Sequence, residues 1–269
     1  MVGDSMIKNI RLFVNKNDKS IKFARLVRNK LTARDFKVIE DDNDDFSLGI
    51  AIGGDGSFLR MVRQNSFNSD LYYVGINTGH LGFLQDVKID EVDEFIDDLM
   101  VENYKVDHIG IQETDIVCKD KESKYFSLNE IVIKDINSKL FKADVYIEDD
   151  LLENYVGDGI MLATSIGSTA HNLSYNGSIV YPSFSSLQIT PMAPINSNRY
   201  RPLTKSVIIP EEVSVDLIPD NDDLVVTFDG EDILFNDVDS ISSKIGKQKI
   251  KVLRFDRYGF AKKINEKLL

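Results

Sequence analysis

Hydrophobic residues follow two alternating patterns in the first hundred positions. Short continuous runs, typical of buried strands, occupy residues 10–14, 36–39, 48–52 and 72–76. Between them, hydrophobic residues recur at helical spacing over residues 19–33, 57–64 and 88–100. Strands that alternate with helices predict parallel β-α-β units, and such sheets bind ligands beyond the carboxyl ends of their strands.

Two of these helices have a clear predicted buried face. In residues 19–33, the spacing places Ile21, Ala24, Val27 and Leu31 together, with lysine and arginine on the other face. In residues 88–100, the predicted buried stripe consists of Ile89, Val92, Ile96 and Leu99. The acidic residues between them are typical of a solvated face.

The pattern changes near residue 104. Short strand-like runs broken by glycine, asparagine and aspartate follow, at residues 115–119, 130–134, 143–147, 206–209, 224–228 and 248–253. We therefore expect a doubly wound α/β domain over residues 1–103 and a mainly β domain over residues 104–253. The tail, residues 254–269, is expected to pack on the first domain, with a short helix after about residue 258.

Composition narrows the functional class. The 269 residues are 42% hydrophobic and 28% charged, as in globular proteins, and the formal net charge is −12. An acidic balance argues against a nucleic-acid carrier, which needs a dense basic surface. Cys118 is the only cysteine, and the chain has neither a secretory signal pattern nor a long apolar stretch. We expect a cytoplasmic protein without a disulfide.

The first candidate for chemistry is Gly53-Gly54-Asp55-Gly56-Ser57, at the end of a predicted strand. Glycines let a backbone approach a ligand closely, and N–H groups at the start of the next helix favour a phosphate. A carboxylate there repels phosphate unless it accepts a proton from an attacking hydroxyl or helps to hold Mg²⁺. Spacing alone fits an ordinary Asp-Gly turn equally well.

A second glycine-rich run, GINTGHLGFL over residues 75–84, follows the next strand, so both turns should lie at one edge of the sheet. Its alternative is a connecting loop, and His80 is expected to be structural. A third run, GDGIMLATSIGSTAHNLSYNGSIV over residues 157–180, offers Asp158 and several hydroxyls suited to a base or ribose. With three histidines and no G-x-S-x-G elbow, a serine hydrolase is disfavoured.

Two shorter motifs are ambiguous by themselves. Asn129-Glu130 suits an adenine edge or ribose hydroxyls, but without context a polar turn is the better interpretation. Asp229-Gly230 is a common turn signal. So few histidines and cysteines also exclude a metal cluster built from these two residue types.

Taken in order, these motifs resemble those of the NAD kinase family. The GGDG turn, the second glycine loop, Asn129-Glu130 and the GDG…GSTA run of residues 157–178 are similar to its motifs. The fifth similar motif is the later segment with TPMAP (residues 190–194) and NRYRPL (residues 198–203). A lone GGDG is shared with lipid kinases and phosphofructokinases, whereas five motifs in order are specific.

The resemblance implies a fold, a reaction and a cofactor. The fold is an α/β domain and a β-sandwich-like domain, with the tail returning to the first. The reaction is Mg²⁺-dependent transfer of the terminal phosphoryl group of ATP, or of polyphosphate, to the 2′-hydroxyl of the adenosine ribose of NAD, giving NADP. Homodimers or homotetramers are implied, with neighbouring subunits completing the pocket.

The resemblance also implies roles for residues. Asp55 is the expected general base, Asn129 and Glu130 are expected to hold the adenosine, and Asp158 to contact the nicotinamide half. The expected substrate-binding residues for NAD and ATP are Gly53, Gly54, Gly56, Ser57, Asn77, Gly79, Phe83, Asn129, Glu130, Asp158, Ser168, Thr169, Ala170, His171, Ala193 and Asp229. No residue is assigned as a metal ligand.

The chain departs from the family pattern in the third run. Ser165-Ile166 stands where the family has proline followed by threonine or serine, so a hydroxyl beside the adenine is missing. His171 replaces a tyrosine, and Asn176-Gly177-Ser178 replaces Gly-Gly-Pro. Imidazole can stack and hydrogen-bond, but it gains charge near neutral pH. These changes concern base binding and leave the GGDG turn intact.

Two other functions remain to be distinguished. A lipid or sugar kinase of the same superfamily would share the GGDG turn but lack the second glycine loop and the GDG…GSTA run. A non-catalytic NAD(P) sensor would keep the pocket, but a binder gains nothing from the Asp55 carboxylate beside phosphates. The sequence leaves open the phosphoryl donor, NAD against NADH, the oligomer size and allosteric regulation.

Overall fold

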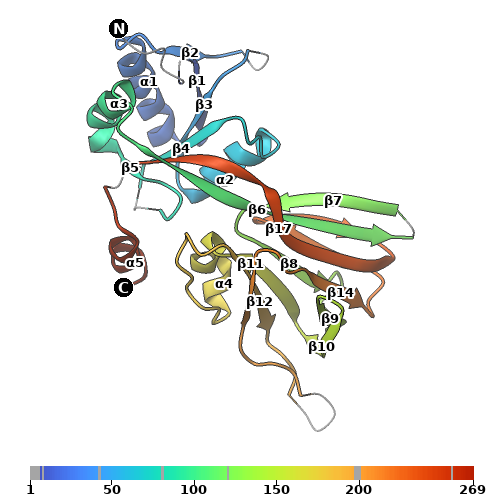
Figure 1. The fold of residues 1–269 in the computed structure, drawn as a ribbon. Coiled ribbons are helices and arrows are strands. Elements are labelled where there is room, and N and C mark those ends of the chain that lie inside the picture. Colours follow the sequence, from blue (N-terminus) through green and yellow to red (C-terminus); the bar gives the residue numbers. More distant parts are fainter. Residues whose placement is uncertain are drawn as a thin grey trace. The chain divides into compact units, whose positions relative to one another are not determined.

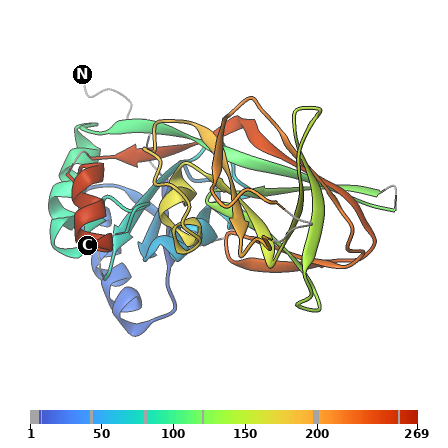
Figure 2. The same cartoon turned by 90° about the horizontal axis from the view of Figure 1, so that it is seen from below.

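The computed structural model describes residues 7, 9–41, 44–79, 82–119, 121–196, 201–255 and 257–269. The chain forms two compact units, Met1–Ile109 with Lys249–Leu269, and Gly110–Gln248. It passes between them inside two long paired strands, β6 (Lys105–Cys118) and β17 (Val238–Arg254). Both strands are visible side by side in Figure 1 and Figure 2, β6 in green and β17 in red. The second unit is therefore an insertion into the first.

The first unit contains a parallel sheet in the order β2-β1-β3-β4, with β5 and the end of β17 also paired to β4. Its strands are β1 (Asn9–Val14), β2 (Lys37–Ile39), β3 (Leu48–Gly53), β4 (Tyr72–Asn77) and β5 (Val87–Lys88). β3 is buried along its whole length, as expected of a central strand that is covered on both faces. The strands predicted in this region are confirmed, and β5 was not foreseen.

The first unit also contains helices, several of which pack on this sheet. They are α1 (Asp18–Thr32), α2 (Asp55–Gln64), the 3₁₀ turn η1 (Ile89–Glu91), α3 (Val92–Met100) and α5 (Phe260–Leu268). Asn17 caps α1 by accepting a hydrogen bond from the N–H of Ser20 (2.8 Å). Figure 1 shows α1 and α3 lying against each other.

The predicted buried faces of these helices need two corrections. Ile21 is 40% exposed, because the face of α1 that meets the core runs through Ser20, Phe23, Ala24, Val27 and Leu31. In α3 the buried stripe includes Phe95, and Ile89 lies in the preceding 3₁₀ turn and is half-buried. The helical spacing was correct in both cases, and the face was shifted by one position in α1.

The second unit is a two-sheet β structure, which confirms the sandwich-like prediction. One sheet is fully antiparallel in the order β13-β12-β11-β8-β15-β16, and the other contains β10-β9-β14-β17 together with β6 and β7. A hydrophobic cluster joins the two inner faces, including Ile131 and Leu162 of the first sheet and Val145 and Leu217 of the second.

The remaining elements of the second unit have the following bounds: β7 (Lys121–Ser127), β8 (Glu130–Asp135), β9 (Phe141–Ile147), β10 (Asp150–Gly157), β11 (Gly159–Thr164), η2 (Ile166–Thr169), α4 (His171–Ser174), β12 (Ser186–Met192), β13 (Val207–Pro210), β14 (Val215–Pro219), β15 (Leu224–Phe228) and β16 (Glu231–Phe235). Each predicted strand lies on one of these or on β6 or β17. None of the helices in the described ranges is both long and apolar enough to span a bilayer.

Candidate active site

The GGDG turn joins β3 to α2. Gly54 is the N-cap of α2, and its carbonyl oxygen accepts the N–H of Ser57 (2.8 Å). A Cβ on Gly53 would lie 2.3 Å from Ser57 Oγ, so no larger residue fits there. Around Gly54 and Gly56, by contrast, a Cβ would meet no atom of the described chain within 4 Å. The described chain thus leaves both glycines uncrowded at the N-terminus of α2, where the first N–H groups of a helix favour an anion.

The second glycine-rich turn lies beside the first. Gly53 pairs with Asn77 in the parallel register of β3 and β4, which confirms that both turns end at the same sheet edge. The N–H of Thr78 donates to the carbonyl oxygen of Gly53 (3.2 Å), and the N–H of Gly79 donates to Asn77 Oδ1 (2.6 Å). His80 and Leu81, which belong to this motif, lie outside the described residues.

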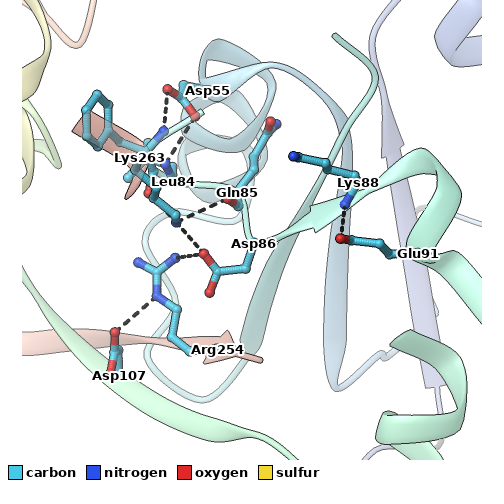
Figure 3. A network of polar contacts seen from close by, with 10 residues as sticks. Asp55, Leu84, Gln85, Asp86, Lys88, Glu91, Asp107, Arg254 and Lys263 are labelled. Carbon is cyan, nitrogen blue, oxygen red and sulfur yellow. Dashed lines mark hydrogen bonds and ion pairs between the residues drawn. The ribbon is translucent and has the colours of Figure 1, made fainter. Parts of the chain in front are cut away.

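Asp55, the first residue of α2, is held by this second turn (Figure 3). The N–H of Leu84 donates to Oδ1 and the N–H of Phe83 donates to Oδ2, each at 3.1 Å. A Cβ on Gly82 would lie 2.0 Å from Oδ1, so the carboxylate packs directly on that glycine. Two peptide N–H groups thus fix the carboxylate plane, and the carboxylate remains half-buried.

The C-terminal helix α5 completes the surroundings of Asp55, which the sequence did not predict. Lys267 Nζ donates to Asp55 Oδ2 at 2.7 Å and lies 4.8 Å from the centre of the Phe83 ring. One helical turn earlier, Lys263 is buried and donates to the carbonyl oxygens of Phe83 and Gln85, each at 3.2 Å. No local signal indicates these contacts, because Lys267 is 212 positions from Asp55.

The buried lysine is compensated by charge. Lys263 Nζ forms an ion pair with Asp86, which Arg254 also contacts at 3.2 Å, while Arg254 donates to Asp107 at 3.0 Å (Figure 3). Burial lowers the pKa of Lys263, and the Asp86 charge opposes that shift. This network anchors α5 to the chain just after Phe83, and so holds Lys267 in place.

In the second unit, Asp229 organises the Asn129-Glu130 motif. Asp229 has φ of +48° in the tight turn between β15 and β16, and its carboxylate accepts backbone N–H groups from the chain opposite. Asp229 Oδ2 accepts from Leu128 (2.8 Å), and Oδ1 from Asn129 (2.7 Å) and Glu130 (3.3 Å). Among the described residues, Asp229 therefore acts on the backbone of the motif.

The side chains of the motif keep unused hydrogen-bonding capacity. Asn129 and Glu130 are 7% and 6% exposed, and Asn129 Oδ1 and Glu130 Oε2 have no hydrogen-bond partner in the described part of the chain. Burial, reinforced by the charge of Asp229, raises the pKa of Glu130 to about 8, although the N–H of His171 opposes the shift. Two buried acceptors without partners are typical of a site that a polar ligand satisfies.

The raised pKa of Glu130 predicts a pH-dependent stability. The folded protein keeps this proton between pH 4.5 and 8, whereas the unfolded chain loses it near 4.5. The stabilisation of the folded state that this raised pKa provides is therefore complete below pH 4.5. It is lost as the pH rises to 8, with a slope of about 1.4 kcal/mol per pH unit. We expect the unfolding free energy of Glu130→Gln to fall less steeply with pH than that of the wild type, in denaturant titrations without ligand. The exposed variant Glu122→Gln should keep the wild-type slope, and equal slopes in all three proteins would contradict the assignment.

The GST run lies directly against Asn129. A Cβ on Gly167 would lie 1.9 Å from the carbonyl oxygen of Asn129, and the Gly167 N–H donates to Thr164 Oγ1 (3.2 Å). Ser168 is fully buried, and its hydroxyl donates to the carbonyl oxygen of Ser165 (2.6 Å) and accepts the N–H of Val180 (3.0 Å). Thr169 is 8% exposed and bonds only weakly to Ile166 (3.4 Å).

The two residues after this run are more accessible. Ala170 is half-buried, and His171, which opens α4, is exposed, with its ring 5.4 Å from that of Tyr175 in an edge-on arrangement. Burial, helped by the charge of Lys134, lowers the pKa of His171. This shift favours the neutral imidazole at neutral pH.

Asp158 and Ala193 form a separate group at the other end of β11. The N–H of Asp158 donates to the carbonyl oxygen of Met192 (2.9 Å), directly before Ala193, and both residues are exposed. Ala193 has φ of +45°, a left-handed conformation that is strained for a residue with a side chain. The length of β11, roughly 17 Å at 3.3 Å per residue, separates this group from Asn129.

Metal-binding capacity is limited. The described residues include no group of three or more histidine, cysteine, aspartate or glutamate side chains placed to hold a metal ion. Asp55, the carboxylate of the GGDG turn, already accepts from two peptide N–H groups and Lys267. The protein therefore offers no preformed metal cage in this part of the chain.

Known proteins are similar to this chain in both of its units. Residues 10–104 match the model of the ATP-NAD kinase N-terminal domain, and residues 128–255 match the ATP-NAD kinase C-terminal domain. An NAD kinase of Finegoldia magna is 38% identical, with 97% of this chain and 98% of the relative covered. An NAD kinase of Lactobacillus acidophilus is 30% identical, with 91% and 90% covered.

Solved structures share the fold at lower sequence identity. The yeast NADH kinase complexed with NADH has a TM-score of 0.86 at 21% identity and covers 97% of this chain and 87% of that one. An NAD kinase of Archaeoglobus fulgidus in complex with ATP has a TM-score of 0.73 at 19% identity, with 94% and 95% covered. With both domain models and near full-length relatives in agreement, the chain belongs to the NAD kinase family.

Proposed function

We propose that this chain, as an NAD kinase, transfers the terminal phosphoryl group of ATP to the 2′-hydroxyl of the adenosine ribose of NAD, with Asp55 as the general base. Conversion of NAD to NADP follows from the family and from similarity over nearly the full length. The ribose oxygen bonds to the terminal phosphorus, the bond from phosphorus to the bridging oxygen breaks, and ADP leaves. The hydroxyl proton passes to Asp55.

The observation that carries this proposal is the placement of Asp55. Its carboxylate is fixed by the N–H groups of Phe83 and Leu84, at a helix N-terminus where Gly54 and Gly56 are uncrowded. Phosphoryl transfer requires in-line positioning and charge neutralisation, and little covalent assistance. The fixed carboxylate would orient the attacking hydroxyl and accept its proton, while the N–H groups at the start of α2 and the donor's Mg²⁺ would neutralise phosphate charge.

We assign Lys267 the role of positioning Asp55. Its ammonium contacts Oδ2 at 2.7 Å and is half-exposed, so it both orients the carboxylate and lies close to where phosphate charge would accumulate. Lys267→Met is expected to lower kcat by about tenfold, because charge-assisted hydrogen bonds contribute roughly 1.5–3 kcal/mol. The KM for NAD should change by less than about twofold, as expected when a group assists mainly the transition state.

Two variants separate this role from simple helix stabilisation. Lys267→Arg should recover most of kcat, because it keeps a cation at this position. Lys262→Met removes a cation of the same helix that contacts Glu266 and the Tyr258 ring instead of Asp55, and it should behave as the wild type. Steady-state kinetics on the four proteins give the answer, and an equal loss in the Lys262 variant would mean that the effect comes from α5 as a whole.

We assign the adenosine portion of NAD to Asn129 and Glu130. Their unpaired buried oxygens suit the amino group of adenine and the ribose hydroxyls as donors. Asp229 supports this site by fixing the backbone of residues 128–130, and Gly167 permits the close approach of the GST run. Thr169, Ala170 and His171 would line the pocket. The buried Ser168 would support them indirectly, through the hydrogen bonds of its hydroxyl to the backbone.

Asp158 and Ala193 enter the proposal through a second subunit. Because β11 separates them from Asn129, one subunit's Asp158 is poorly placed to share a ligand with its own adenosine site. We propose a cytoplasmic homodimer or homotetramer in which this exposed pair completes a neighbour's pocket. Light scattering across a concentration series tests the assembly, and Asp158→Ala should raise the KM for NAD.

Magnesium fits this reaction as part of the substrate. Since the described residues form no metal cage, Mg²⁺ would arrive on the phosphates of the donor, where it neutralises charge. Asp55 would then face a partly neutralised phosphate chain. Residues of this protein would supply orientation and proton acceptance.

A direct assay tests the function. Purified protein is incubated with NAD or NADH and Mg²⁺, with ATP or polyphosphate as donor, and NADP is followed with an NADP-specific dehydrogenase. We expect NADP from NAD and at least one of these donors. If folded protein forms none with any combination, the proposed reaction is wrong.

A further inference from the structure

Gln85 is a fully buried amide to which the reaction as described assigns no role. It follows Leu84 in the segment whose N–H groups hold Asp55 (Figure 3). Its Nε2 donates a buried hydrogen bond to the carbonyl oxygen of Gly53, at 2.9 Å. Because Gly53 is the first residue of the GGDG turn, Gln85 connects the second glycine-rich turn to the start of the first.

The oxygen of the same amide is unsatisfied. Gln85 Oε1 has no hydrogen-bond partner in the described part of the chain, although the side chain is completely buried. The reversed amide would place this oxygen against the Gly53 carbonyl oxygen, another acceptor, so the observed orientation is the favourable one. A buried acceptor without a partner destabilises the folded state, and such groups are typical of functional sites.

The neighbours of Gln85 hold both its side chain and its backbone. A Cβ on Gly75 of β4 would lie 2.5 Å from Gln85 Cγ, so the stem of Gln85 occupies the space that a side chain there would need. Lys263 Nζ donates to the carbonyl oxygen of Gln85 at 3.2 Å. The amide that contacts Gly53 is therefore firmly supported.

The GGDG turn needs an external restraint of this kind. Gly53 and Gly54 lack side chains, so the peptide that joins them has unusual conformational freedom, and its rotation would redirect the side chain of Asp55. The Gly53 carbonyl oxygen also accepts the N–H of Thr78, at 3.2 Å, and the bond from Gln85 is the shorter one. Because a peptide is planar, fixing this carbonyl also fixes the N–H of Gly54 at the start of α2.

Three consecutive residues of the second turn thus hold the first turn at two points. Phe83 and Leu84 bind the carboxylate of Asp55, and Gln85 binds the backbone two residues before it. Bonds to the carboxylate alone would leave the backbone of the turn free to rotate. With the bond to Gly53, the backbone and the carboxylate are tied to the same segment, as precise placement of a reacting group requires.

We propose that Gln85 is a positioning residue for phosphoryl transfer, whose amide N–H holds Gly53 so that Asp55 faces the attacking hydroxyl in the orientation that accepts its proton. The inference rests on the proposed function, because it takes Asp55 as the general base. Since the side chain of Gln85 is fully buried, it acts through Gly53 and Asp55 and not on a substrate.

The test compares Gln85→Met with the wild type in steady-state kinetics and thermal unfolding. We expect kcat to fall by about tenfold, because one hydrogen bond that places the reacting group is lost. The KM for NAD should change by less than about threefold. The midpoint of thermal unfolding should stay the same or rise, because the change removes the unsatisfied Oε1 and leaves Gly53 bonded to Thr78.

Gln112→Met is the matched control, since it makes the same change at another fully buried amide. Both ends of the Gln112 amide are paired, Nε2 with Ser243 Oγ at 2.9 Å and Oε1 with Ser127 Oγ at 3.0 Å. This variant should show the opposite result, with a lower midpoint of thermal unfolding and kcat within about twofold of the wild type.

A double variant determines whether Gln85 acts through Asp55. Adding Gln85→Met to Asp55→Asn should lower kcat by less than a further twofold, because both changes affect the same group. A tenfold loss that persists in the Asp55→Asn background would show that Gln85 acts independently of Asp55, and would overturn the inference.

The remaining outcomes separate this inference from the proposed function. Wild-type protein that forms no NADP contradicts the function itself. An active wild type with unchanged kcat in Gln85→Met overturns the role of Gln85 alone. So does a fall of the unfolding midpoint together with kcat in Gln85→Met, because that result is typical of a residue needed only for packing.

Discussion

Replacement of Asp55 by asparagine is expected to lower kcat by about 10²–10⁴-fold, the usual contribution of a general base. The variant keeps the size of the side chain and one oxygen for the N–H groups of Phe83 or Leu84, so the turn should persist. It loses the proton acceptor and the charge that Lys267 contacts. Binding of NAD should therefore change by no more than about threefold.

Two measurements check this expectation. Steady-state kinetics give kcat, and calorimetric titration of NAD gives the affinity of the wild type and of Asp55→Asn. If affinity and turnover fall by the same factor, Asp55 is a binding residue and the base assignment is wrong. Thermal unfolding serves as the control, since a variant that does not fold would lose both NAD affinity and turnover whatever the role of Asp55.

The second large effect is expected at Gly82, where the carboxylate of Asp55 lies. A Cβ added to Gly82 would lie 2.0 Å from Asp55 Oδ1 and 2.6 Å from its Cγ, well inside contact distance. The side chain is the easier partner to move, so Gly82→Ala should displace the carboxylate. Because catalysis depends on placement to within about 1 Å, we expect kcat to fall by about 10²-fold or more.

A matched glycine provides the control. Gly259→Ala changes a residue with ordinary backbone angles, around which a Cβ would meet nothing within 4 Å. It should retain wild-type kcat, with at most a small loss of stability because Gly259 is the N-cap of α5. Gly82→Ala should remain folded and bind NAD, and combining it with Asp55→Asn should add little further loss, since both act on the same group. Full activity of Gly82→Ala would show that the turn relaxes without moving Asp55.

The sequence predicted the fold well wherever local periodicity is strong. The parallel strands near residues 10–14, 48–52 and 72–76 and the helices of the first unit were found, because each has a clear buried face. The exposed Ile21 shows the limit of this reasoning. A helix pattern gives the spacing of buried residues, but a polar residue such as Ser20 can replace a hydrophobic one on the buried face.

The surroundings of the predicted site residues were less accessible to sequence reasoning. Adjacent glycine turns could be predicted, because consecutive parallel strands end at one edge. The ammonium of Lys267 and the carboxylate of Asp229 could not, because each acts on a segment 99 or more positions away. Ser168 resembles a ligand-binding hydroxyl in sequence, yet its hydroxyl bonds to the backbone around it.

The insertion of one unit into the other has a consequence for synthesis on the ribosome. Gly110–Gln248 is a continuous stretch, so this unit can complete its core without any of residues 249–269. The first unit has to wait for residues 249–269, which supply the strand beside Tyr72 and the lysine beside Asp55. The first unit therefore begins to be synthesised before the second unit but completes its structure after it. Asp55 acquires its charged neighbour, Lys267, only at that last stage.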